Sequence, residues 1–242
     1  MISYRIRKDI EEEILPEFED ELRNLEGKEI LITGGTGFLP SYLVDILAFF
    51  NRNIKHPIKL KILSKNPIKK GSRLDHLIDD ENVKFIPLDL GRDFKIPGNP
   101  QIIIHAASRA NPSSFNRNPL DTIDCNINGT RRLLEYARDD KIEQFVFFSS
   151  FEIYGNPPRE FIPTPESYNG NVDCTDENAC YVEAKRLSET LTSTFHRQFE
   201  VPTKTLRILL AYGPGIRDDG KIVSKFFRQG IKDKKINIKQ GA

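Results

Sequence analysis

Cysteine is scarce in this sequence of 242 residues, which contains only Cys125, Cys174 and Cys180. An odd and sparse set argues against a disulfide framework and favours reduced thiols, so we expect an intracellular, cytoplasmic protein. None of the three cysteines has the spacing of a zinc site, and we expect no metal.

Charge of one sign and long apolar runs are also lacking. Lysine and arginine number 36 against 35 aspartate and glutamate, a formal net charge of +1, so nothing points to a nucleic-acid partner. No apolar run could span a bilayer, and the start, MISYRIRKDIEEE, has no signal-peptide core, so we expect no membrane partner. Hydrophobic residues still make up 38% of the chain, which is enough for the core of one large α/β domain.

Short apolar segments alternate with helical patterns along most of the chain. The patterns predict strands at 29–33, 59–64, 83–90, 101–107, 144–150 and 203–209, and helices at 40–50, 119–138 and 179–199. Strands that are apolar throughout and separated by helices indicate a parallel sheet covered on both faces. The predicted fold class is therefore α/β with a doubly wound parallel sheet, the Rossmann fold, which binds ligands at the carboxyl ends of its strands.

Two stretches lie outside this alternation. Residues 9–25 carry apolar residues at helical spacing, and we expect Pro16 to break them into two short helices. We expect residues 1–26 to form a helical extension that packs on the sheet edge or on a partner subunit. Residues 155–178 are rich in proline and asparagine and should form a long loop, and such loops are usually functional.

A glycine-rich turn, Thr33-Gly34-Gly35-Thr36-Gly37-Phe38-Leu39-Pro40, joins the first predicted strand to the first helix. Its glycines allow a tight turn and let backbone N–H groups approach a pyrophosphate, and the helix N-terminus adds partial positive charge. This turn therefore predicts a dinucleotide site.

A second motif pairs a phenol with an ammonium. Tyr181 and Lys185 are four residues apart and share one helix face. A nearby cation should favour the phenolate and lower a tyrosine pKa that is ordinarily about 10. Tyr181 could then accept a proton from a hydroxyl group during hydride transfer. Ser150 ends the fifth predicted strand and should lie on the same rim of the sheet.

These segments together resemble the extended short-chain dehydrogenases, the NAD-dependent epimerase/dehydratase family. TGGTGFL at 33–39, SSFEIYG at 149–155 and YVEAK at 181–185 carry the resemblance, which extends over nearly everything from Gly27 onward. The stretches 166–190 and 212–226 look most like the UDP-glucuronate decarboxylase and nucleotide-sugar dehydratase branch. Pro40 replaces the last glycine of the family loop, and proline is tolerated in a first helical turn.

The resemblance implies a set of site residues. Those implied to be catalytic are Ser150, Glu152, Tyr181 and Lys185. Those implied to bind the cofactor are Gly34, Gly37, Phe38, Leu39, Ser64, Lys65, Asp89, Leu90, Ala106, Ala107, Ser108, Tyr181 and Lys185. His105 ends the fourth strand as in the family, and the helix of the Asn126-x-Asn128-Gly129-Thr130 motif should support the site.

The cofactor is expected to be NAD, with NADP as the alternative. An acidic residue at the end of the second strand would bind the ribose 2′-hydroxyl and favour NAD. Here that strand ends in Ser64-Lys65-Asn66, and Lys69, Lys70 and Arg73 follow. These groups would accept a 2′-phosphate, or they form a solvated basic face.

The resemblance implies oxidation of a sugar C4 hydroxyl to a 4-keto intermediate, followed by decarboxylation or epimerisation of a nucleotide sugar. Glu152 matches the family's acid–base glutamate, or it only satisfies a loop. Phe151 stands where dehydratases carry an aspartic acid, and because phenylalanine transfers no proton it argues against 4,6-dehydration. The alternative function is a non-catalytic dinucleotide-binding module or redox sensor on the same fold.

Domain organisation follows from the same resemblance. We expect a Rossmann domain at 27–210 and, at 211–242, the start of a substrate-binding domain that is incomplete. Either the chain is truncated or a second chain completes the site. We also expect a homodimer that pairs through the helices at about 119–138 and 179–199.

Overall fold

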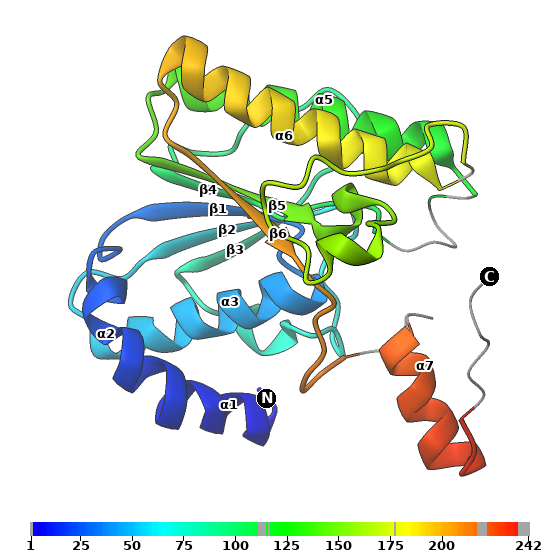
Figure 1. The fold of residues 1–242 in the computed structure, drawn as a ribbon. Coiled ribbons are helices and arrows are strands. Elements are labelled where there is room, and N and C mark those ends of the chain that lie inside the picture. Colours follow the sequence, from blue (N-terminus) through cyan, green and yellow to red (C-terminus); the bar gives the residue numbers. More distant parts are fainter. Residues whose placement is uncertain (1, 111–114, 116, 177, 217–221, 237–242) are drawn as a thin grey trace.

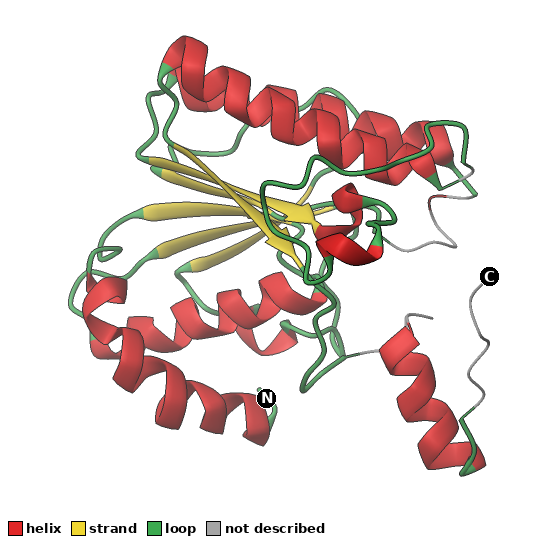
Figure 2. Ribbon diagram, viewed as in Figure 1, coloured by secondary structure: helices red, strands yellow, loops and turns green. Residues whose placement is uncertain are grey.

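The computed structural model describes residues 2–110, 115, 117–176, 178–216 and 222–236. A six-stranded parallel sheet lies between two layers of helices (Figure 2). Helix α3 covers one face of the sheet, and α5 and α6 lie side by side on the other (Figure 1). The doubly wound α/β prediction is confirmed.

The strands follow the predicted order with small changes at their ends. They are β1 (Glu29–Thr33), β2 (Lys59–Ser64), β3 (Val83–Pro87), β4 (Ile102–His105), β5 (Gln144–Ser150) and β6 (Thr203–Ile208). The main helices are α3 (Phe38–Phe50), α5 (Pro119–Asp139) and α6 (Ala179–Phe199). The third and fourth strands end before the predicted 90 and 107, because the chain turns there into the loops that line the site.

The strand order is β3-β2-β1-β4-β5-β6. The chain winds outward from β1 to β3 and then crosses back to β4, which pairs with β1. The order reverses between β1 and β4, and in such sheets a crevice opens at that point, outside the carboxyl ends of the strands.

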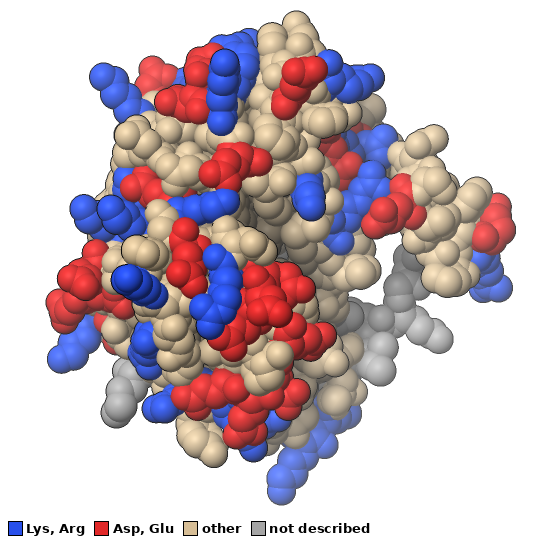
Figure 3. Space-filling view, turned by 90° about the vertical axis from the view of Figure 1, so that its left-hand side faces the viewer, with Lys and Arg blue, Asp and Glu red and all other residues tan. Residues whose placement is uncertain are grey.

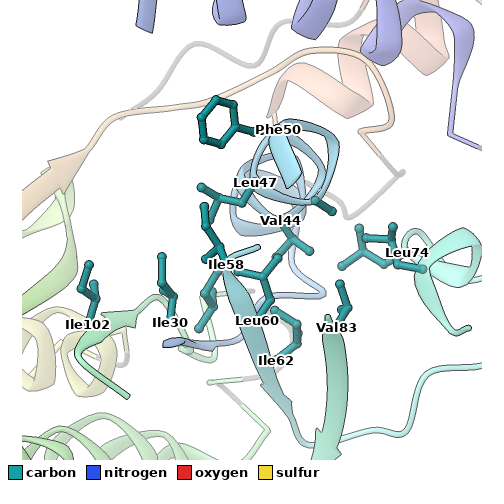
Figure 4. Packing of buried hydrophobic residues seen from close by; sticks show 13 residues of the cluster. Ile30, Val44, Leu47, Phe50, Ile58, Leu60, Ile62, Leu74, Val83 and Ile102 are labelled. Carbon is teal, nitrogen blue, oxygen red and sulfur yellow. The ribbon is translucent and has the colours of Figure 1, made fainter. Parts of the chain in front are cut away.

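The core consists of two apolar layers, one on each face of the sheet. Ile30 and Ile32 of β1 are fully buried on the α3 side, whereas Leu31 is buried on the α5–α6 side. This alternation follows from the two-residue period of a strand. Figure 4 shows the α3 side, where Val44 and Leu47 of the helix face the side chains of the strands.

The N-terminal residues form a helical extension that packs on α3. It consists of α1 (Tyr4–Asp9), a π-helical segment at Ile10–Ile14 and α2 (Leu15–Arg23). The expected break at Pro16 is wrong: the π-helical segment continues directly into α2, and Pro16 lies inside this continuous helical stretch, directly after the π-helical turns. Acidic side chains gather over α1 and α2 in Figure 3, on the solvent-exposed side of the extension.

The C-terminal residues leave the sheet after β6. A short helix, α7 (Ile222–Arg228), and a π-helical segment at Gln229–Asp233 stand apart from the three layers (Figure 1). Residues 217–221 of the 212–226 stretch and residues 237–242 lie outside the described residues. Within the described part of the chain, no helix is both long and apolar enough to cross a membrane.

Candidate functional site

A cleft of about 750 Å³ opens at the carboxyl ends of the strands. Its walls come from the glycine-rich turn, the ends of β2, β4 and β5, the first turns of α6 and the segment after β6. Every residue to which the sequence resemblance gave a catalytic or cofactor-binding role lines this cleft. The structure therefore brings the predicted set together, although the role of each residue stays a prediction.

The glycine-rich turn is held close to the end of β4. The Gly34 N–H donates to the Leu63 carbonyl at 2.7 Å, and Gly34 has a φ of +67°, a conformation that favours glycine. A Cβ atom at Gly34 would come within 2.6 Å of the Ala107 Cα. This turn therefore needs a residue without a side chain to bring its backbone against β4.

Helix α3 begins directly after this turn. Gly37 has the extended backbone of an N-cap residue, and its N–H donates to the Gly34 carbonyl at 2.8 Å. Pro40 is buried in the first helical turn, where its missing N–H leaves no helical bond unmade. The free N–H groups and partial positive charge of this helix end suit a pyrophosphate, so the turn fits a dinucleotide.

The cleft wall formed just after β2 and β3 contains an ion pair. The Lys65 ammonium lies 2.7 Å from the Asp89 carboxylate, which also accepts a 3.1 Å hydrogen bond from the Gly91 N–H. Burial would raise the pKa of Asp89, but the Lys65 and Gly91 hydrogen bonds outweigh it and lower that pKa. Asp89 is therefore an ionised acceptor on the cleft wall.

Beneath the cleft, a buried histidine joins three elements. His105 Nδ1 lies 2.7 Å from Thr33 Oγ1 of β1, and His105 Nε2 lies 2.9 Å from Thr130 Oγ1 of α5. Thr130 Oγ1 donates to the Asn126 carbonyl and so accepts from Nε2–H, which makes Nδ1 the acceptor. Burial, aided by the charge of Lys185, lowers the pKa of His105 to about 3, so this imidazole is neutral.

Tyr181 lies in the first turn of α6 with its hydroxyl hydrogen-bonded to Ser150 and Ser108. The expected lowering of its pKa is not found. Burial raises the pKa of Tyr181 to about 12; the charge of Glu152 adds to this, and the two serine hydrogen bonds oppose it. In the chain alone the phenol is therefore protonated at neutral pH.

Lys185 is buried one turn further along α6, only 2% exposed. Its ammonium donates to the Phe148 carbonyl at 2.7 Å and lies 4.7 Å from the centroid of the Phe147 ring. Burial lowers the pKa of Lys185 to about 8, so it is still mostly charged at pH 7. The ammonium thus adds positive charge to the cleft while its hydrogen bond fixes it to β5.

The end of β5 continues into a short 3-10 helix at Phe151–Tyr154. The Glu152 N–H donates to Ser150 Oγ at 3.2 Å, so the serine caps this helix as well as holding the phenol. The Phe151 side chain is 38% exposed and lines the cleft. It presents only carbon atoms to the cleft.

Phe115 and Arg207 hold parts of the site without lining the cleft, and neither was among the predicted site residues. The Phe115 ring is buried against the Tyr181 ring, with centroids 5.5 Å apart and an interplanar angle of 7°. Arg207 of β6 donates to Tyr154 Oη, to the Glu166 carbonyl and to the Glu189 carboxylate, which ties the 155–178 loop to the sheet. No local pattern marks either residue, because both act on partners distant in sequence.

The fold and the Ser150–Tyr181–Lys185 arrangement together define a short-chain dehydrogenase type of protein with a nicotinamide-dinucleotide cleft. The model of the "NAD dependent epimerase/dehydratase family" matches residues 30–240. The chain belongs to this family, as its sequence motifs predicted. UDP-glucuronic acid decarboxylase 5 of Arabidopsis thaliana is 33% identical over 214 residues, which cover 87% of this chain and 59% of that protein.

Solved structures show the same fold. UDP-N-acetylglucosamine 4-epimerase from Methanobrevibacter ruminantium, in complex with UDP-N-acetylmuramic acid, superposes with a TM-score of 0.71 at 23% identity and covers 86% of this chain and 64% of that one. UDP-glucuronic acid 4-epimerase from Bacillus cereus, in complex with UDP-glucuronic acid and NAD, gives 0.66 at 22% identity and covers 85% and 63%. This chain therefore spans about three fifths of the length of its relatives.

Proposed function

We propose that this protein uses NAD to oxidise a hydroxyl group of a nucleotide sugar to a keto intermediate, which is then decarboxylated or epimerised and reduced. The observation that carries the proposal is the Tyr181 hydroxyl, hydrogen-bonded to Ser150 in the same cleft as the glycine-rich turn. Its relatives are enzymes of this kind, which favours an enzyme over a non-catalytic module.

Different residues of the cleft would bind the cofactor and transfer the proton. The α3 N-terminus and the glycine-rich turn would hold the pyrophosphate, and Asp89 the adenosine. A bound oxidised nicotinamide would supply hydride acceptance and a positive charge beside the phenol. Tyr181 Oη would then take the proton of the sugar hydroxyl, Ser150 Oγ would hold that hydroxyl, and the Lys185 ammonium would favour the phenolate.

Phe151 and Glu152 bear on the second half of the reaction. Phe151 transfers no proton, which supports decarboxylation or epimerisation over 4,6-dehydration. Glu152 lines the same cleft as Tyr181, and its charge acts on the phenol. We assign Glu152 the role of an acid or base on the same substrate.

Incubation with NAD and a panel of UDP-, GDP-, CDP- and dTDP-sugars, followed by NMR, tests the proposal. We expect a pentose or an epimer as product, and loss of turnover by about 10²-fold or more in Tyr181→Phe. Dinucleotide binding without turnover, unchanged by Tyr181→Phe, would support the non-catalytic alternative instead.

We also propose that residues 211–242 begin the sugar-binding part of the enzyme. Phe227 and Ile231, in α7 and the segment after it, are 53% and 76% exposed, which suits a surface that other residues cover. Deletion of residues 222–242 should leave dinucleotide affinity within about twofold and abolish sugar-nucleotide turnover.

A homodimer through α5 and α6 is the proposed assembly. These helices form the outer layer of one sheet face, and Leu120 and Leu187 on them are 74% and 44% exposed. Light scattering should give twice the chain mass, and a Leu120→Asp, Leu187→Asp double variant should be monomeric. A monomeric wild-type chain would contradict this assembly.

A further inference from the structure

The end of β2 lacks the group that selects against a 2′-phosphate. A nicotinamide dinucleotide and its 2′-phosphorylated form differ only at the adenosine ribose, which Rossmann folds contact at the end of the second strand. An acidic residue there hydrogen-bonds the 2′-hydroxyl and repels a phosphate. In this chain β2 ends at Ser64, and the residues from Ser64 to Leu74 include no aspartate or glutamate.

Four cations follow β2, and the structure distinguishes among them. The Arg73 guanidinium donates to the Gly215 carbonyl at 2.8 Å and lies over the Phe38 ring, so it joins the segment after β6 to the start of α3. Lys69 and Lys70 are exposed outside the residues that line the cleft. Lys65 lines the cleft.

The Lys65 ammonium lies at the cleft and has hydrogen-bond donors left beyond its contact with Asp89. Its side chain is 55% exposed while its ammonium contacts Asp89 at 2.7 Å. An ammonium has three N–H donors, so Lys65 can keep this contact and still donate to a phosphate. The Asp89 carboxylate keeps its hydrogen bond from the Gly91 N–H if Lys65 turns toward the ribose.

We infer that this cleft binds a 2′-phosphorylated nicotinamide dinucleotide, with Lys65 as the phosphate partner, and that NADP is bound at least as tightly as NAD. The inference rests on the proposed function, because it concerns the adenosine end of the same cleft. It departs from the relatives, because the family is described as NAD dependent.

Fluorescence titration of the full chain with NADPH and NADH tests the inference without any need for turnover. We expect the dissociation constant for NADPH to be equal to or below that for NADH. Lys65→Ala should weaken NADPH binding about tenfold or more and NADH binding by less than about twofold, and Lys65→Arg should retain NADPH affinity. Lys69→Ala, which removes an equal charge from the same segment outside the cleft, is the matched control.

Adenosine fragments locate the effect. We expect 2′,5′-ADP to compete better than 5′-ADP for the wild-type chain, and Lys65→Ala to remove the difference. NADH binding more than about tenfold tighter than NADPH, or an equal loss of both in Lys65→Ala, would overturn the inference and leave the proposed function intact. Failure to bind either dinucleotide would overturn both.

Discussion

The ring of Phe115 lies flat against the ring of Tyr181, with 5.5 Å between centroids and 7° between planes. The contact joins the β4–α5 connection to the first turn of α6. Both side chains are almost fully buried, so Phe115 covers one face of the tyrosine and leaves the phenol edge directed at Ser150. Phe115 therefore restricts where the phenolic oxygen can lie.

Replacement of Phe115 tests this restriction. Phe115→Ala should lower kcat about tenfold or more with little change in KM, because a small displacement of a proton acceptor is costly. Phe115→Leu retains bulk on the same face and should recover most of the rate. Equal loss of dinucleotide affinity and of kcat in both variants would instead indicate general unfolding.

Gly34 of the glycine-rich turn can be compared with Gly71, which lies after β2 and has a similar backbone conformation. Gly34 has a φ of +67° and no room for a Cβ, whereas Gly71 has a φ of +83° and open space around it. Gly34→Ala should lower the free energy of unfolding by more than about 2 kcal/mol, and Gly71→Ala by only about 1 kcal/mol, the cost of the backbone conformation alone. Urea unfolding measures both.

Dinucleotide titration completes that comparison. Gly34→Ala should also lose dinucleotide binding, since the turn must move away from Ala107 to make room, and Gly71→Ala should keep it. Equal stability losses in the two variants would show that the close approach at Gly34 is unimportant.

His105 predicts a pH dependence of stability. Its pKa is about 3 in the folded chain and about 6.5 when exposed, so below pH 6.5 the unfolded chain takes up a proton that the folded chain does not. The free energy of unfolding should therefore fall by up to about 1.4 kcal/mol per pH unit from this group as the pH drops from 6.5 toward 3.

A His105→Gln variant isolates that contribution. It removes the titrating group, so the difference in stability between wild type and variant should shrink as the pH is lowered from 7 to 5. Parallel stability curves for the two proteins over this range would contradict the buried neutral imidazole.

Lys185 predicts a conflict between activity and stability. Burial lowers its pKa to about 8 from 10.5, so the folded state bears the cost of a buried charge at neutral pH. Lys185→Met should abolish turnover yet raise the free energy of unfolding, by at most about 3 kcal/mol. The gain should be constant below pH 8 and disappear between pH 8 and 10.5, where the folded lysine loses its proton first. A destabilised Met variant would show that the Phe148 hydrogen bond outweighs the burial.

The elements that the sequence predicted best are those whose signal is local. The apolar runs that became β1, β2 and β5 stand between turn residues, and the glycine-rich turn lies between a strand and a helix, so bounds and contents agree with the structure. The sequence also predicted the parallel winding of the sheet, and this winding places Gly34, Ser150 and Tyr181 on one rim. This much of the site was predictable without coordinates.

The errors have a common cause, which is burial by partners distant in sequence. Spacing placed Lys185 beside Tyr181 but could not show that the lysine donates to Phe148 or that desolvation dominates the phenol pKa. Phe115 lies in a connection without periodicity. Pro16 is the exception, because its cause is local: a π-helical segment precedes this proline, and no sequence pattern predicted that segment.

The hydrogen bonds from Thr33 to His105 and from His105 to Thr130 have a consequence for protein engineering. They connect the first strand of the chain to a helix almost a hundred positions later, so a hybrid that joined the first half of this protein to the second half of a relative would have to preserve all three side chains together. Residues on the cleft wall such as Lys65 and Phe151 are partly exposed to solvent and take no part in these hydrogen bonds. Natural variants with altered ligand preference should therefore differ at the exposed residues of the cleft wall and retain the buried Thr33, His105 and Thr130 side chains.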